Sequence, residues 1–102
     1  MIHVIATIEL VDTWRGAFLD EFRRLVDVVR QEDGCIEYGP AIDVATAIGD
    51  LAPPRADVVT VIEKWNSVSA LAAHLKAPHM AEYRGKVSHM LAKVTIRVLE
   101  PA

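Results

Sequence analysis

The 102-residue chain contains a single cysteine, so it cannot form a disulfide within itself. Its uninterrupted apolar runs are only a few residues long, whereas a membrane-spanning helix needs roughly 20. The first residues lack the basic segment and cleavage site of a secretory signal. These absences predict a protein of the reducing cytoplasm that does not insert into a membrane.

Neither positive nor negative charge dominates the chain. The chain has 11 Lys and Arg residues against 14 Asp and Glu residues, and the basic residues are scattered along it. Neither feature is typical of a nucleic-acid surface, so no nucleic-acid partner is expected. His74 and His79 are five residues apart but have no third metal ligand at a recognisable spacing, so we predict no metal site.

Hydrophobic residues are abundant for so short a chain. They make up 52% of the sequence, and the mean hydropathy is +0.23. The length allows one domain, residues 1–102, and a monomer of this size buries only about 65% of the surface of its unfolded chain. Part of the apolar surface is therefore expected to be covered by another chain.

The pattern of apolar residues predicts alternating strands and helices. Apolar residues at every second position predict a strand over 2–9, and steps of three and four predict a helix over 14–32 with an N-cap at Asp12 or Thr13. Pro40 predicts an edge strand or a bulge, and a long loop follows. The other expected elements are strands 35–43, 57–65 and 93–99, the loop 44–56, a helix from a cap at Asn66 or Ser67 to about 76, and a helix starting at Pro78.

This order is typical of an α+β, ferredoxin-like split βαβ fold with a four-stranded antiparallel sheet and helices on one face. Both faces of the 57–65 strand carry apolar residues, with Val58 and Ile62 on one side and Val59 and Val61 on the other. An antiparallel sheet with one solvated face alternates more cleanly. We therefore expect a homodimer in which two sheets pack face to face.

Six residues stand out for their chemistry, each with a structural alternative. Glu63 lies between Val61 and Trp65 on one strand face, either as a polar anchor in an apolar pocket or as a structural carboxylate bonded within the fold. His74 and His79 flank a break between helices, as a base or proton shuttle or as capping histidines. The aromatic residues Tyr38, Trp65 and Tyr83 either pack the core or wall a planar ligand.

Several short motifs occur in a fixed order along the chain. They are Glu32-Asp33-Gly34-Cys35 followed by Tyr38, then Glu63-Lys64-Trp65, then Leu71-x-x-His74-Leu75-x-x-Pro78-His79-Met80. This ordered set resembles the antibiotic biosynthesis monooxygenase family, and it resembles most the bacterial quinol monooxygenase branch. The resemblance implies a dimeric α/β barrel of two ferredoxin-like subunits, each with a small cavity between its sheet and helices.

The resemblance also implies an activity. Such proteins oxidise hydroquinones or related planar phenols with O2 and without a metal or flavin, so no cofactor is expected. His74 is then the candidate base, while Tyr38 and Glu63 would hydrogen-bond the substrate oxygens or orient the base. His79, Trp65, Met80 and Tyr83 are the candidate substrate-binding residues, with His79 as the second choice for the base.

Two other functions fit the same fold. The first is an isomerase-like enzyme acting on a phosphorylated or small polar substrate, which would need a cationic site, and Arg55, Arg84, Lys86 and Arg97 form no cluster in the sequence. The second is a non-enzymatic ligand-binding dimer of a stress response, in which Glu63 and His74 pair structurally. The room left in the pocket discriminates between the second function and an aromatic monooxygenase.

Overall fold

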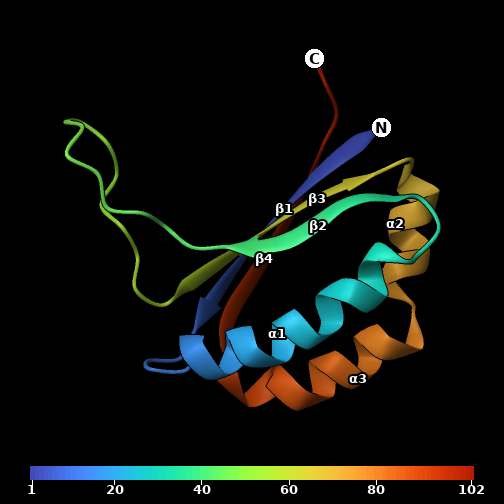
Figure 1. Cartoon of the computed structure of the whole chain (residues 1–102), viewed down its shortest axis with the longest axis horizontal. Helices are drawn as coiled ribbons and strands as arrows, with labels where there is room; N and C mark the ends of the chain where they lie inside the picture. The colour runs from blue at the N-terminus through green and yellow to red at the C-terminus, as the bar shows by residue number, and fades with distance from the viewer.

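The structure, a computed structural model, describes residues 1–102 and consists of one sheet with helices on one face (Figure 1). The elements are, in order, β1 (Ile2–Leu10), α1 (Arg15–Arg30), β2 (Cys35–Ala41), β3 (Val58–Trp65), α2 (Val68–Leu75), α3 (Pro78–Val87), a short 3₁₀ turn η1 (Ser88–Met90) and β4 (Leu91–Leu99). The predicted α+β, ferredoxin-like arrangement is confirmed, and no helix is long and apolar enough to span a bilayer.

The four strands are antiparallel in the order β2-β3-β1-β4. Pro40 lies on the edge strand β2, as its missing N–H requires. Pro40 is therefore at an edge and not at a bulge, because the β2–β3 register shifts between Cys35 and Glu37. The shift places Tyr38 opposite Glu63, so both side chains lie on the helix-covered face.

The helices present the apolar stripes that their spacing predicts. The buried residues of α1 are the five expected from the sequence: Phe18, Phe22, Leu25, Val26 and Val29. The N-cap expected at Asp12 or Thr13 is wrong, since α1 begins after Trp14 without a side-chain cap, and Thr13 has a positive φ of 69°. The cap of α2 is Ser67, whose hydroxyl accepts a hydrogen bond from the backbone N–H of Ala70 at 3.1 Å.

Gly34 joins the end of α1, the start of β2 and the start of α2. Its φ of +83° lies in the left-handed region, and a Cβ there would lie 2.6 Å from the Cβ of Ala70. Its carbonyl accepts a hydrogen bond from the N–H of Asn66 at 2.8 Å. This close approach brings Glu32, just after α1, against α2.

Two apolar surfaces remain uncovered. Val94, Ile96 and Val98 pair with Ile8, Ala6 and Val4 and so share the helix-covered face, yet each is about half exposed. On the opposite face, Ile5 pairs with Ile62, which is 39% exposed. The hydrophobic surplus therefore lies on the edge strand β4 as well as on the outer sheet face. The 42–57 loop projects from the sheet on the side away from α2 (Figure 1) and is fastened at its base by the Arg55–Asp43 ion pair at 2.8 Å.

Candidate active site

A mostly apolar cavity of about 280 Å³ lies between the sheet and the helices α2 and α3. Its polar side chains are few: Tyr38, Glu63, His74, Tyr83 and Arg84. The remaining wall residues are Ala6, Ile8, Phe22, Val61, Leu75, Met80, Val87, Leu91, Val94 and Ile96. A cavity of about 150 Å³ can hold benzene, so this one has room for a two-ring molecule.

The structure brings five of the seven residues singled out from the sequence to this cavity: Tyr38, Glu63, His74, Met80 and Tyr83. Trp65 and His79 do not line it. Trp65 is fully buried beside the cavity, where its ring centroid lies 4.7 Å from that of His74. His79 lies at the start of α3 and lines a different surface depression. Arg84 also lines the cavity, although the sequence suggested it only as one of four candidates for a cationic site.

Glu63 is buried and hydrogen-bonded within the fold. Its Oε1 accepts a hydrogen bond from Trp65 Nε1 at 2.9 Å, and only 6% of the residue is exposed. Burial raises the pKa of Glu63 to about 6 from its ordinary 4.5, and the Trp65 hydrogen bond opposes this rise. The carboxylate is therefore held in the wall of an apolar cavity at a cost in stability.

Replacing Glu63 should show that cost. Because its pKa is raised on folding, the cost is absent below pH 4.5, grows as the pH rises, and is complete above about pH 6. A rise from 4.5 to about 6 corresponds to about 2 kcal/mol. Glu63→Gln keeps an acceptor for Trp65, so it should raise the free energy of unfolding in urea by about 2 kcal/mol at pH 8 and leave it unchanged at pH 4.

The control for this measurement is Glu37→Gln on the same sheet. Glu37 is exposed and pairs with Lys64 at 3.0 Å, so its removal should change the free energy of unfolding by less than about 0.5 kcal/mol. An equal effect of Glu63→Gln at both pH values would show that ionisation of Glu63 is not the cause.

His74 is held by a carboxylate that the sequence did not assign to the site. Its Nδ1 donates to Glu32, at 2.9 Å from Oε2 and 3.2 Å from Oε1. His79 Nε2 donates to the same Oε2 at 2.8 Å. Burial lowers the pKa of His74, and Glu32 partly opposes this. His74 is 2% exposed, so a buried imidazole, neutral at pH 7, stands in the cavity wall with its Nδ1 side already occupied.

In the sequence, Glu32 is marked only by its place in the Glu32-Asp33-Gly34-Cys35 motif. Glu32 is 42 residues from His74 in the sequence, so no spacing rule links the two. The expectation of no metal site depended on sequence spacing alone, and the fold brings a third ligand-type group to the two histidines. The donor atoms of Glu32, His74 and His79 all lie within 4.8 Å of one another and are of kinds that can hold a metal ion.

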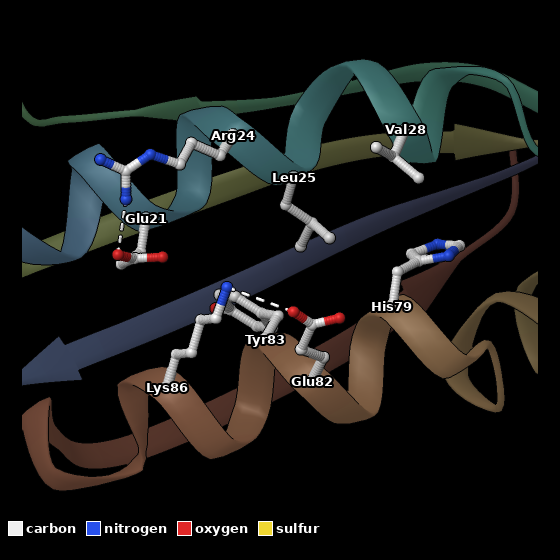
Figure 2. A pocket seen from close by; sticks show the side chains of 8 residues that line it. All are labelled: Glu21, Arg24, Leu25, Val28, His79, Glu82, Tyr83 and Lys86. Carbon is white, nitrogen blue, oxygen red and sulfur yellow. Dashed lines mark hydrogen bonds and ion pairs between the residues drawn. The ribbon is translucent and has the colours of Figure 1, made fainter.

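His79 faces a second, more open depression between α1 and α3 (Figure 2). This groove is about 180 Å³ and its other lining residues are Glu21, Arg24, Leu25, Val28, Glu82, Tyr83 and Lys86. Two ion pairs, Arg24–Glu21 at 2.6 Å and Lys86–Glu82 at 3.3 Å, lie along it. Glu32 thus lies between the apolar cavity at His74 and the polar groove at His79.

The two cavity tyrosines keep their protons at neutral pH. Burial raises the pKa of both Tyr38 and Tyr83, and the nearby Glu63 raises it further in each. Both phenol groups are therefore hydrogen-bond donors to any oxygen placed in the cavity. The site combines two such donors, one carboxyl group and one basic imidazole in an apolar enclosure, which is a setting for proton transfer to and from a small aromatic molecule.

The ferredoxin-like α+β fold and the apolar cavity between sheet and helices define the class of protein: a small single-sheet domain with an internal pocket. Within that class, the chain belongs to the antibiotic biosynthesis monooxygenase family, whose model matches residues 1–86. The family resemblance read from the motifs is thereby confirmed.

The chain is also similar to individual proteins. The chain is 38% identical over 89 residues to the "Probable quinol monooxygenase YgiN" of Escherichia coli K12. The matched segment covers 85% of this chain and 83% of that protein. It is similar in structure to PA3566 from Pseudomonas aeruginosa, with a TM-score of 0.82 and 26% identity over 99% of this chain and 93% of the other. It is also similar in structure to Rv0793 from Mycobacterium tuberculosis, with a TM-score of 0.79 and 26% sequence identity. That match covers 99% of this chain and 94% of the other.

Proposed function

We propose that the protein is a monooxygenase that oxidises a hydroquinone or a similar planar phenol with O2 in the cavity, with His74 as the base. The observation that carries this proposal is the neutral, buried His74 in an apolar wall, held at Nδ1 by Glu32. Membership in the family and the 38% identity to a protein named as a probable quinol monooxygenase support the same reaction class.

The hydrogen bond to Glu32 determines which nitrogen of His74 is basic. Because Nδ1 donates to the carboxylate, the proton of the neutral ring is on Nδ1 and the lone pair is on Nε2. Glu32 does not line the cavity whereas His74 does, so Nε2 is the nitrogen available to a substrate hydroxyl. Glu32 also stabilises the imidazolium that forms when Nε2 accepts a proton.

The reaction then balances without another reductant. His74 Nε2 accepts a hydroxyl proton, and the resulting quinolate transfers one electron to O2. The two radicals combine through a new C–O bond at a ring carbon. Loss of the ring C–H proton and cleavage of the O–O bond then give a hydroxyquinone and water, with the proton on His74 returned to the departing oxygen. The hydroquinone supplies all four electrons, and the apolar wall keeps bulk water from the anion.

Glu63, Tyr38 and Tyr83 orient the substrate in this proposal. The two phenols donate to the substrate oxygens, and Glu63 accepts from the second hydroxyl. Met80 and the aliphatic wall contact the rings. Trp65 acts indirectly, by holding Glu63 and packing against His74.

The experiment is to supply 1,4-naphthohydroquinone and follow O2 consumption above the uncatalysed rate. With ¹⁸O-labelled O2, the expected product is a hydroxyquinone that carries one labelled oxygen. Formation of unlabelled quinone and hydrogen peroxide would show an oxidase, and a rate equal to the background would contradict the proposal. His89→Gln, at an exposed histidine beside Trp14, is the control variant and should retain the wild-type rate.

We further propose that two chains pair through the outer sheet face in the reducing cytoplasm. Ile5 and Ile62 form an apolar centre on that face, with Thr7, Thr60 and Arg97 around it. A symmetric pairing would cover both isoleucines and explain part of the hydrophobic surplus. Light scattering at micromolar concentration should give twice the chain mass of 11.2 kDa, and a monomer would contradict the pairing.

A further inference from the structure

The cluster behind the cavity has a composition that the proposed oxidation does not fully use. Only the hydrogen bond between His74 and Glu32 serves the base, whereas His79 adds a second imidazole to the same carboxylate oxygen. We propose that Glu32, His74 and His79 bind a divalent transition-metal ion such as Zn²⁺, and that this ion switches off the base.

The donor set suits such an ion. Two imidazole nitrogens and a carboxylate oxygen are borderline ligands that favour divalent zinc, cobalt, nickel or iron over magnesium or calcium. With metal–nitrogen bonds of about 2.0–2.1 Å, neighbouring ligands around one ion lie roughly 3.3 Å apart. The distances from Glu32 to the two histidines, 2.8 and 2.9 Å, need to widen by only about half an ångström.

The three groups also differ in their freedom to move. The His74 side chain is 2% exposed and packs edge-on against Tyr38, so its Nδ1 is fixed. The His79 side chain, which lines the open groove between α1 and α3 (Figure 2), is 28% exposed. Its ring is therefore less confined than that of His74. A site with one fixed ligand and one adjustable ligand can rearrange around an ion without repacking the core.

The groove between α1 and α3 provides the entry path. His79 lines it, and the ion pairs Arg24–Glu21 and Lys86–Glu82 balance the charge along it, so no excess positive charge repels a cation. Solvent in the groove can complete the coordination sphere, because the chain supplies three ligands and zinc takes four or more. The ion would lie on the Nδ1 side of His74, away from the cavity, since neither Glu32 nor His79 lines the cavity.

The effect on the base follows from the two nitrogens of His74. A metal bound at Nδ1 needs the lone pair of that nitrogen, so the proton of the neutral ring moves to Nε2. Nε2 then has no lone pair for a substrate hydroxyl. The inhibition rests on the proposed function of His74, whereas metal binding does not.

The test is calorimetric titration of the whole protein with ZnCl₂, together with the visible absorption of bound Co²⁺. One ion per chain should bind, and His79→Gln should weaken binding at least tenfold. The control is His89→Gln, which removes an exposed histidine outside the cluster and should leave zinc affinity unchanged. Absence of binding, or equal binding to His79→Gln and wild type, would overturn the site.

The activity measurement separates the two proposals. Zn²⁺ at a saturating concentration should abolish hydroquinone oxidation by wild type. Inhibition of the His79→Gln variant should need a higher Zn²⁺ concentration. Binding of one ion without inhibition, or stimulation by the ion, would overturn the switch. If wild type oxidises no hydroquinone at all, the proposed function fails, while calorimetry still decides the metal site.

Discussion

His74→Gln should lower kcat for hydroquinone oxidation by about 10²–10⁴-fold, the range in which a positioned general base contributes. Glutamine can still donate an N–H to Glu32, so the carboxylate keeps a partner, but it has no lone pair basic enough to accept a phenolic proton. The measurement is O2 consumption over a range of hydroquinone concentrations, which separates kcat from KM. KM should change little, because the substrate oxygens keep their contacts with the tyrosines.

Loss of rate through misfolding has to be distinguished from loss of the base. The His74 ring packs against Trp65 and Tyr38, with centroids 4.7 and 5.4 Å away, so its replacement leaves a small gap in the core. A cooperative thermal transition and unchanged tryptophan fluorescence of the variant would establish that the fold is intact. A well-folded His74→Gln protein with the wild-type rate would assign the base to another residue.

The sequence predicts those parts of the structure that depend on local spacing. The stripe from Phe18 to Val29 and the serine cap of α2 follow from rules that act within a few residues. The cap before α1 is wrong because Thr13 takes a left-handed conformation and Trp14 occupies the cap position. Caps and bulges are set by how a connection enters its element, which tertiary packing decides.

The site is only partly predictable for a related reason. Strand alternation places Glu63 and Trp65 on the helix-covered face, as found, but it does not say which of them reaches a cavity. His79 faces the groove because α3 starts at Pro78 in a new direction. Glu32 meets His74 only because Gly34 permits the close approach to Ala70, so the contact is a product of the tertiary fold.

Glu32→Gln should lower kcat by about 10²-fold or more, although Glu32 touches no substrate. If the glutamine amide turns its NH₂ toward His74, Nδ1 must accept, and the ring proton moves to Nε2, where it blocks the base. If the amide oxygen faces Nδ1 instead, the hydrogen bond survives, but a neutral partner no longer stabilises the imidazolium. The rate therefore falls in either orientation. Imidazole ¹⁵N shifts report which nitrogen is protonated.

The double variant Glu32→Gln/His74→Gln tests whether the two residues act as a unit. If Glu32 works only through His74, the double variant should be no slower than His74→Gln alone. Glu82→Gln, in the adjacent groove, is the matched control and should retain the wild-type rate. A further loss in the double variant would show that Glu32 has a role of its own. Full non-additivity would instead mean that Glu32 acts by setting the state of one imidazole, the same state that a metal ion at Nδ1 would reverse.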